Sequence, residues 1–216
     1  MNGSPMQMNE QRGIVCGVII LAAGASSRMG RPKMLLPWGA TSVLGHLIGQ
    51  WQTLGAEQIA VVCAVGDSAV PGELRRLGFP LDHCILNPTP ESGMFSSIQC
   101  AARWLGWNPD LTHWAILLGD QPHLRPETLR ALLDFAAAQP ARICQPSRTG
   151  RPRHPVLLPA ATFAQLKISS AENLKQFLQT RFRDLALCEM DDPGLDMDID
   201  QPGDYERAIQ VFMKKA

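Results

Sequence analysis

Short apolar runs alternate with amphipathic stretches along almost the whole chain of 216 residues, and this alternation limits the fold more than any other feature. A strand that is buried on both faces has a continuous apolar run, whereas a helix that covers a sheet is apolar on one side only. Strands and helices that follow each other in this order indicate an α/β protein. We therefore expect a doubly wound, mostly parallel sheet with helices on both faces.

The order of the elements also indicates where chemistry should lie. The predicted strands are the apolar runs at residues 13–22, 58–65, 83–87, 113–120, 142–147, 154–159 and 185–190. The predicted helices are the amphipathic runs at residues 41–55, 70–78, 96–106, 125–139, 171–182 and 201–216. Ligands of such sheets bind beyond the carboxyl ends of the strands. The residues that directly follow each strand are therefore the candidates for a functional site.

Composition excludes several kinds of partner. Lys plus Arg and Asp plus Glu number 20 each, so the net charge is zero and no basic field points to nucleic acid. No apolar stretch is long enough to span a bilayer, so we expect no membrane partner. Residues 1–12 lack the apolar core of a secretory signal. We expect them to be a disordered leader, and residues 13–216 to form a single domain.

The six cysteines contain no C-x-x-C pair, and nearly all of them lie in apolar runs. This spacing supports neither a disulfide framework nor a zinc site. Buried, reduced thiols are typical of cytoplasmic proteins. We therefore expect a cytoplasmic protein.

The first predicted strand ends in a positively charged turn of small residues, AAGASSRMGRPK from Ala22 to Lys33. The turn is not a dinucleotide fingerprint, because Ser26 stands where a glycine is needed, and it is not a Walker A loop. Small residues let backbone N–H groups approach an oxyanion, while Arg28 and Lys33 suit phosphate oxygens. Two interpretations stand at this point: a phosphate-binding turn, or an ordinary connection with solvated basic residues.

Asp120 ends the apolar run of residues 113–120. A carboxylate at the end of a buried strand needs a partner, because burial of an unpaired charge is expensive. Mg²⁺ takes few protein carboxylates and shares its other positions with phosphate and water. Asp120 is thus a candidate metal ligand or, alternatively, a turn former or helix cap before Pro122.

Asp196, Asp198 and Asp200 alternate in DMDIDQPGDY, so an extended segment would place all three on one side. Like charges that close repel each other unless a cation lies among them. The alternative is a solvated acidic turn that caps the last helix, and this alternative is strongest for Asp196. A basic turn and two carboxylate loops together suit metal-assisted attack on a nucleoside triphosphate.

The stretch LAAGASSRMGRPKMLLP resembles a family signature, L-A-[AG]-G-x-S-x-R-M-G-x-P-K-x-L-L-P. The signature is that of the nucleotidyltransferases related to the molybdenum cofactor enzymes, which include cytidylyltransferases and molybdopterin-guanine-dinucleotide synthases. The similarity continues in order at NPTPESGMFSSI, LLGDQP, HPVLL and DIDQPGDY, and so covers nearly the whole chain. It implies a nucleotide-diphospho-sugar-transferase-like, Rossmann-like sheet with one antiparallel strand.

The resemblance also implies a Mg²⁺-dependent nucleotidyltransferase. Guanylyl-transferring relatives tend to carry LAGG and cytidylyl-transferring relatives LAAG, and this chain has Ala23 at the position that differs. The implied reaction transfers CMP from CTP to the phosphate of molybdopterin and releases pyrophosphate. The acceptor phosphate is already anionic near neutral pH and needs no general base, so the aspartates are assigned to the metal.

The family motifs assign roles to the residues that match them. Arg28, Lys33 and Asp120 would be the catalytic groups, with Arg28 and Lys33 on the triphosphate. The nucleotide would also contact the backbone platform and the loop near base and ribose: Leu21, Ala22, Ala23, Gly24, Gly93, Ser96 and Ser97. Asp120 and Asp200 would hold Mg²⁺, with Asp198 close by. His154 would lie on the acceptor side.

Arg153 departs from the family pattern, which has glycine before the histidine. We expect Arg153 either to contact an anionic acceptor or to face solvent. Other hypotheses stay open beside CMP transfer to molybdopterin. They are guanylyl transfer from GTP, cytidylyl transfer to a sugar or polyol phosphate, and a non-catalytic accessory protein that delivers cofactor to a client molybdoenzyme. Nucleotide binding without pyrophosphate release would favour the accessory protein.

Overall fold

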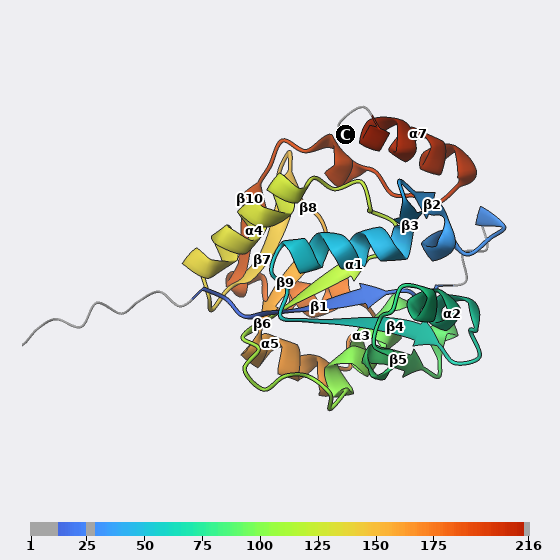
Figure 1. Ribbon diagram of the computed structural model, residues 1–216. Coiled ribbons are helices and arrows are strands. Elements are labelled where there is room, and N and C mark those ends of the chain that lie inside the picture. Colours follow the sequence, from blue (N-terminus) through green and yellow to red (C-terminus); the bar gives the residue numbers. More distant parts are fainter. Residues whose placement is uncertain (1–12, 25–28, 214–216) are drawn as a thin grey trace, which may run out of the picture.

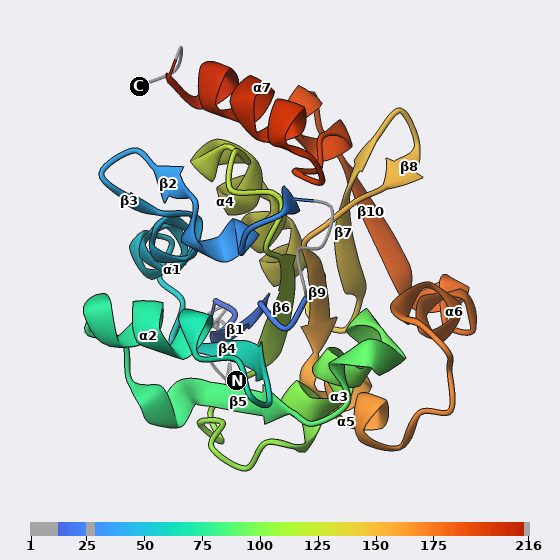
Figure 2. The ribbon, with the colours of Figure 1, turned by 90° about the vertical axis from the view of Figure 1, so that its right-hand side faces the viewer.

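The computed structural model describes residues 13–24 and 29–213. They form an eight-stranded sheet with helices packed around it (Figures 1 and 2). The strand order is β10-β7-β9-β6-β1-β4-β5, and β8 pairs with β7. The strands are β1 (Cys16–Leu21), β4 (Gln58–Ala64), β5 (Cys84–Asn87), β6 (His113–Leu118), β7 (Ile143–Arg148), β8 (Arg151–Pro152), β9 (Val156–Pro159) and β10 (Leu185–Glu189). The leader predicted at residues 1–12 lies outside the described residues.

The central strand β1 marks a switch in the direction of the chain across the sheet. From β1 the chain continues to β4 and β5 on one side, and then returns to β6 on the other side. β1 is parallel to both β4 and β6, and Leu21 is the register partner of Leu118. The residues that follow β1 and β6 therefore leave the sheet next to each other.

The predicted doubly wound, mostly parallel sheet is confirmed. β9 is the antiparallel strand between β6 and β7, and the short β8 is also antiparallel to β7. Both antiparallel strands belong to the segment that contains Arg153 and His154. Because β9 pairs directly with β6, this segment lies beside the carboxyl end of β6.

Helices cover both faces of the sheet (Figure 1). One face carries α1 (Val43–Thr53), α2 (Ala69–Arg76) and α4 (Pro126–Ala138); the other carries α3 (Met94–Arg103), α5 (Ala160–Gln165) and α6 (Leu174–Gln179). Successive residues of β1 serve the two layers in turn. Val18 and Ile20 pack in the first core, while Ile19 packs in the second.

Local sequence signals explain several of the helix ends. Ser42 Oγ accepts a hydrogen bond from Gly45 N at 3.0 Å, so Ser42 is the N-cap of α1. Gly55, with φ of 86°, follows the end of this helix. The helix predicted at residues 171–182 is shorter in the structure, because Asn173 caps α6 through a 2.9 Å bond from Gln176 N.

The segment after β10 returns to the carboxyl end of β6. A 3-10 turn, η7 (Pro193–Asp196), is followed by Ile199, whose N–H donates to Asp120 O over 3.0 Å. Ile199 is buried, so its neighbours Asp198 and Asp200 are carried to the end of β6. The chain then forms α7 (Pro202–Met213), where the Tyr205 hydroxyl donates to Pro37 O.

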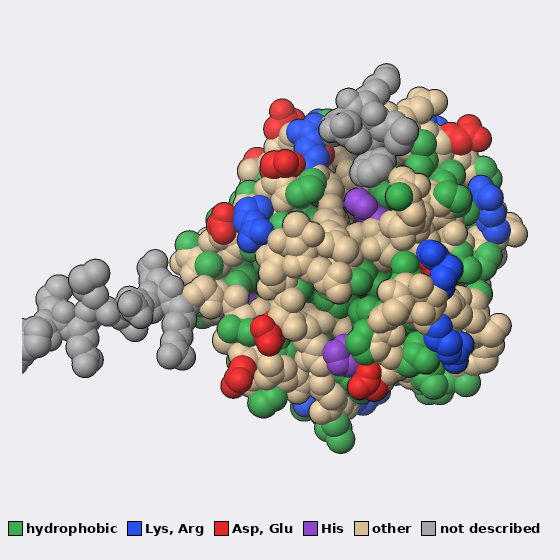
Figure 3. All heavy atoms as spheres, viewed as in Figure 1, with side chains coloured by type: hydrophobic (Ala, Val, Ile, Leu, Met, Phe, Trp, Pro, Cys, Tyr) green, Lys and Arg blue, Asp and Glu red, His purple; other side chains and the backbone are tan. Residues whose placement is uncertain are grey.

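Acidic and basic side chains lie interspersed on the face that Figure 3 shows. The helices within residues 13–24 and 29–213 are each too short or too polar to cross a membrane.

Candidate active site

A cleft of about 440 Å³ lies beyond the carboxyl ends of β1 and β6, where the chain changes direction across the sheet. We call it the main cleft. Its walls are residues 21–24, Met29, Lys33, Met34, Pro90, Gly93, Met94, Ser97, residues 118–120 and Asp200. A neighbouring hollow of about 410 Å³ shares the turn at residues 22–24 with it and extends to Asp67 and Glu91. Open α/β sheets bind ligands at such switch points.

Lys33 joins two carboxylates at one end of the main cleft. Its Nζ donates to Asp120 Oδ2 at 3.3 Å and lies 3.7 Å from Asp200 Oδ1. The side chains of Lys33 and Asp120 are about one-fifth exposed, and that of Asp200 is 39% exposed. These three residues, the lysine–carboxylate cluster, come from three separate segments of the chain.

Close packing holds Lys33 at this place. Lys33 begins a 3-10 turn, η2 (Lys33–Leu35), and Met34 in that turn is buried against Gly119. A Cβ atom on Gly119 would come within 2.4 Å of Met34 Sδ and within 3.2 Å of Leu21 O. A side chain before Asp120 would force Met34 to shift and would crowd Leu21 O, so glycine at this position allows the η2 turn to approach the end of β6 closely.

The environment of Asp120 suits a divalent cation. Burial raises the pKa of Asp120, Lys33 acts in the opposite direction, and the nearby Asp198 raises it further. Asp120 Oδ1 is buried and accepts no hydrogen bond from any residue that the structure describes. A carboxylate oxygen without a donor, with a second carboxylate close by, fits a hard cation with oxygen ligands.

The number of nearby carboxylates also suits a divalent cation that shares its ligands with a substrate. Within residues 13–24 and 29–213, no three His, Cys, Asp or Glu side chains converge as a ready-made metal cage. Mg²⁺ is usually bound by one or two carboxylates, with water and substrate phosphates as its other ligands. Asp120 and Asp200 could therefore hold a divalent cation together with a bound phosphate.

The loop before α3 forms the opposite wall of the main cleft. Gly93 has φ of 90° and ψ of 176°, which is a conformation open essentially to glycine alone. Asn87 Nδ2 donates to Ser96 Oγ at 2.8 Å and to Ser97 Oγ at 2.9 Å. Gly93 and Ser97 line the cleft, whereas Ser96 bonds back to Gly93 O and fixes the turn.

A second cavity of about 360 Å³ shares Leu118 with the main cleft. We call it the side cavity. Its walls are Leu118, Gln121, Pro152, Arg153, His154, Leu195, Asp196 and Asp198. Gln121 Nε2 donates to Asp198 Oδ1 at 2.8 Å. Asp198 therefore belongs to the side cavity, while Asp200 belongs to the lysine–carboxylate cluster.

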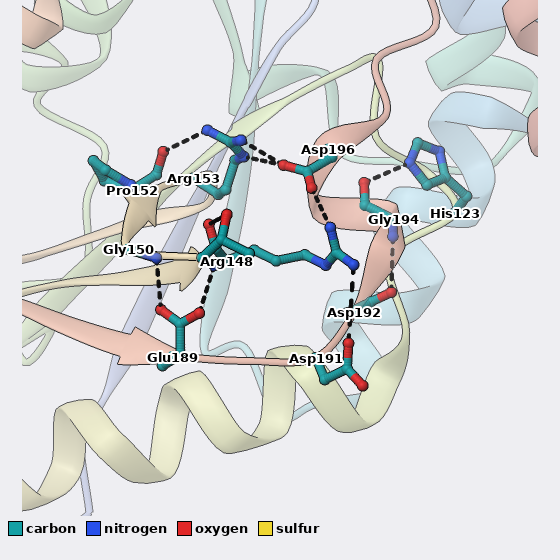
Figure 4. Close-up of polar contacts among 11 residues, drawn as sticks. His123, Arg148, Gly150, Pro152, Arg153, Glu189, Asp191, Asp192, Gly194 and Asp196 are labelled. Atoms are coloured by element: carbon teal, nitrogen blue, oxygen red, sulfur yellow. Dashed lines mark hydrogen bonds and ion pairs between the residues drawn. The ribbon is translucent and has the colours of Figure 1, made fainter.

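Arg153 is bonded within the protein. Its guanidinium donates to Asp196 Oδ1 through Nε at 2.8 Å and also through Nη2, and Arg148 Nη1 donates to Asp196 Oδ2 (Figure 4). These two arginines lower the pKa of Asp196. A carboxylate of the same chain thus pairs with the guanidinium of Arg153 at the rim of the side cavity.

The turn that carries Arg153 is fixed on its other side by Glu189 (Figure 4). The Glu189 carboxylate accepts hydrogen bonds from Ser147 Oγ at 2.7 Å, Thr149 N at 2.5 Å and Gly150 N at 3.2 Å. These bonds secure the hairpin of β7 and β8. The wall of the side cavity is thus held at both ends by carboxylates.

His154 faces the side cavity from the segment between β8 and β9. Burial lowers the pKa of His154, so its imidazole is neutral at pH 7. Its Nδ1 atom is buried and has no hydrogen-bond partner among the described residues. A neutral imidazole with an unused nitrogen can donate to or accept from a ligand in this cavity.

The predicted site residues fall into two groups. The main cleft brings together Leu21, Ala22, Ala23, Gly24, Lys33, Gly93, Ser97, Asp120 and Asp200. The side cavity contains Arg153, His154 and Asp198. Asp196, Asp198 and Asp200 each contact a different residue, namely Arg148, Gln121 and Lys33. Arg28 lies outside the described residues.

Several site residues escaped prediction. Asn87 ends β5 and Gln121 follows Asp120, so their places after strands are the signal that could have found them. Asp67 follows β4 in the same way and accepts from Ala69 N at 2.8 Å, at the start of α2.

A cleft that combines a turn of small residues, a lysine and two carboxylates is typical of α/β proteins that bind a nucleoside triphosphate with a divalent cation. A family model for the MobA-like NTP transferase domain matches residues 18–185, and the chain belongs to this family. The resemblance found in the sequence is thereby confirmed at the level of the family.

Three relatives illustrate the range of similarity. Molybdenum cofactor cytidylyltransferase of Escherichia coli K12 is 27% identical over 195 residues, which are 90% of this chain and 95% of that protein. Bifunctional protein GlmU of Cereibacter sphaeroides is 33% identical over 120 residues, but the match spans only 26% of GlmU and 55% of this chain.

The third relative is a solved structure. Rv0371c of Mycobacterium tuberculosis has a TM-score of 0.71 and 24% identity, covering 92% of this chain and 99% of the other. Its complex with manganese has a TM-score of 0.64 and covers 90% of this chain and 98% of the other. At this identity the likeness establishes the fold alone.

Proposed function

We propose that the protein is a divalent-metal-dependent nucleotidyltransferase that transfers CMP from CTP to the phosphate of molybdopterin and releases pyrophosphate. The observation that carries the proposal is the lysine–carboxylate cluster, in which Lys33 Nζ lies within 3.7 Å of both Asp120 and Asp200. The E. coli relative that matches over 90% of this chain is a molybdenum cofactor cytidylyltransferase, which supports the choice of substrates.

Lys33 and the turn at residues 22–24 would bind the triphosphate. The ammonium of Lys33 offsets negative charge on the α-phosphate and on the departing pyrophosphate. Backbone N–H groups of the small-residue turn can approach phosphate oxygens closely. Arg28 is proposed to grip the outer phosphates.

Asp120 and Asp200 would hold Mg²⁺, which neutralises charge on the phosphate oxygens when it is bound. Asp120 is the better placed of the two, because its Oδ1 atom lacks a donor among the described residues. The manganese complex of Rv0371c supports a divalent cation in this fold.

The side cavity would bind the acceptor. It adjoins the main cleft at Leu118, so an acceptor phosphate in it would lie next to a triphosphate bound in the main cleft. The proposed transfer requires that phosphate to attack the α-phosphorus in line with the departing pyrophosphate. The second pKa of a phosphate monoester is about 6, so the nucleophile is anionic at pH 7 and needs no base. His154 is proposed to donate a hydrogen bond to this phosphate, and Asp198 to accept hydrogen bonds from donor groups elsewhere on the acceptor.

Ala23 would favour cytosine over guanine. It lines both the main cleft and the neighbouring hollow, so its methyl group takes up space that glycine would leave for a larger base. We place the reaction in the cytoplasm, because all six cysteines are free thiols and reduced thiols persist there.

The test is pyrophosphate release with Mg²⁺ and each nucleoside triphosphate in turn, with and without molybdopterin. The proposal expects release with CTP only, and only when molybdopterin is present. Release with GTP alone would contradict the role of Ala23. Binding of CTP without release under any condition would favour an accessory protein instead.

A further inference from the structure

Lys33 contacts Asp120 and Asp200, the two carboxylates that are proposed to bind the divalent cation. It reaches them from η2, with Nζ at 3.3 Å from Asp120 Oδ2 and 3.7 Å from Asp200 Oδ1. Asp120 follows β6. The hydrogen bond from Ile199 N to Asp120 O holds the segment that contains Asp200 beside it. One ammonium therefore bridges two segments that the fold forces together.

The two carboxylates need positive charge whether or not a substrate is bound. Their backbones are fixed by β6 and by the buried Ile199, so they cannot move far apart. Asp198 adds a third negative charge nearby and raises the pKa of Asp120. Like charges at this spacing repel strongly in a partly buried site. Lys33 reduces that repulsion.

An ammonium and a divalent cation cannot share these oxygens without repelling each other. The Lys33 side chain has space for a second position, because it lines both the main cleft and the hollow beside the turn at residues 22–24. Its long, flexible side chain can therefore turn from the carboxylates towards that turn while its backbone stays in place. A bound triphosphate would offer the ammonium new partners there.

We propose that Lys33 acts as a resident counter-ion of Asp120 and Asp200, competes with the divalent cation for them, and gives them up when a triphosphate binds. This inference rests on the proposed function. Nucleotide binding then strengthens cation binding, and cation binding strengthens nucleotide binding by the same factor, because coupling between two sites is reciprocal. Lys33, which is proposed to assist the reaction, thus weakens binding of the divalent cation when no nucleotide is bound.

The experiment is a titration of the full chain with Mn²⁺, in which free Mn²⁺ is followed by electron paramagnetic resonance. Wild type, Lys33→Met and Lys167→Met are each titrated with and without α,β-methylene CTP, which cannot release pyrophosphate. Lys167 is the matched control, because it is exposed in the turn after α5 and its removal changes the net charge by the same amount.

Lys33→Met is expected to bind Mn²⁺ about tenfold more tightly than wild type without the analogue, within the usual range of site-to-site coupling. The analogue should tighten Mn²⁺ binding strongly in wild type and Lys167→Met, and much less in Lys33→Met. Equal or weaker binding of Mn²⁺ by Lys33→Met without the analogue would overturn the inference.

Stability provides a second measurement. Without metal, Lys33→Met should unfold at a lower temperature than wild type, since its carboxylates lose a counter-ion, and Mn²⁺ should raise its melting temperature more than that of wild type. A smaller Mn²⁺-induced rise than in wild type would count against the inference. If Lys33→Met does not fold, Lys33→Gln serves for both measurements.

Failure of the inference can be told from failure of the proposed function. Asp120→Asn removes a proposed metal ligand and is titrated in parallel. If wild type binds Mn²⁺ no better than Asp120→Asn, even with the analogue, both the proposed function and the inference fail. If wild type binds Mn²⁺ through Asp120 but Lys33→Met gains no affinity, only the inference fails.

Discussion

Gln121 holds Asp198 in the side cavity through a 2.8 Å hydrogen bond from Nε2 to Oδ1, and so separates Asp198 from its neighbour Asp200. Ile199 lies between the two aspartates and is buried in the core. The two carboxylates therefore face different cavities, although only one residue separates them. This division predicts different consequences when each is neutralised.

Asp198→Asn should raise KM for the acceptor severalfold and leave Mn²⁺ affinity in the presence of nucleotide within about twofold, since Asp198 is assigned to acceptor binding. Asp200→Asn should weaken Mn²⁺ binding at least tenfold, because it removes a ligand. Steady-state kinetics and Mn²⁺ titration of the two variants check this. An identical loss of Mn²⁺ affinity in both would show that Asp198 is also a ligand.

Ala23→Gly should relax the choice of nucleotide. Removal of one methyl group beside the base is expected to raise the ratio of kcat/KM for GTP to that for CTP about tenfold, a typical effect of one methyl group in a pocket. The measurement is pyrophosphate release at limiting concentrations of each nucleotide. An unchanged ratio would contradict the role of Ala23 in the choice of nucleotide. Asp67 and Glu91 of the neighbouring hollow would then be the next candidates for that role.

Gly93→Ala should destabilise the protein and weaken nucleotide binding. No atom within 4 Å would meet the added Cβ atom, so the cost comes from the backbone conformation alone, at about 1–3 kcal/mol. Gly72→Ala in α2 is the control, because its Cβ atom also has open space but its backbone is helical. Urea unfolding should show a loss for Gly93→Ala and no loss for Gly72→Ala. Equal stability of the two variants would contradict strain at Gly93.

Asp192 should make stability depend on pH. Burial alone would raise the pKa of Asp192, but hydrogen bonds from Thr128 Oγ1 and from the backbone N–H groups of Gly194 and Arg125 outweigh it and hold the pKa below its ordinary value. The ionised carboxylate therefore stabilises the folded state above the unfolded-state pKa of about 4, and this contribution is lost as the pH falls through the folded-state pKa.

Asp192→Asn is therefore expected to lower the free energy of unfolding by about 1–3 kcal/mol at pH 7. The difference from wild type should shrink as the pH falls below about 4. Asp191→Asn is the control, because the Asp191 side chain is 99% exposed and should change stability little. A pH-independent difference for Asp192→Asn would contradict the role of its charge.

Much of the sheet could be predicted from the sequence, because strands covered on both faces have continuous apolar runs. The β1 and β6 segments are clear examples. The short pair β2 (Pro37–Trp38) and β3 (Thr41–Ser42) and the helix α5 have too few residues for a periodic pattern. Packing against neighbouring segments decides such short elements, and a single sequence does not display that packing.

The candidate site could be predicted in part for a related reason. Lys33, Asp120 and Asp200 each follow or adjoin a recognisable element, and their types suit phosphate and a cation. The link between Arg153 and Asp196 could not be predicted, because it depends on how the β7–β8 hairpin meets η7 across 43 residues of sequence. The same holds for the contacts of Asn87 with Ser96 and Ser97.

Pyrophosphate release by Asp120→Ala, measured against wild type with CTP, Mg²⁺ and molybdopterin, tests the central claim most directly. Asp120 is proposed to hold the cation next to the reacting phosphate, so its loss should lower turnover by about a thousandfold or more. The variant should keep the circular dichroism spectrum of wild type, since the carboxylate lies at the end of β6 and outside the core. A folded Asp120→Ala protein that releases pyrophosphate at the wild-type rate would contradict the proposed mechanism.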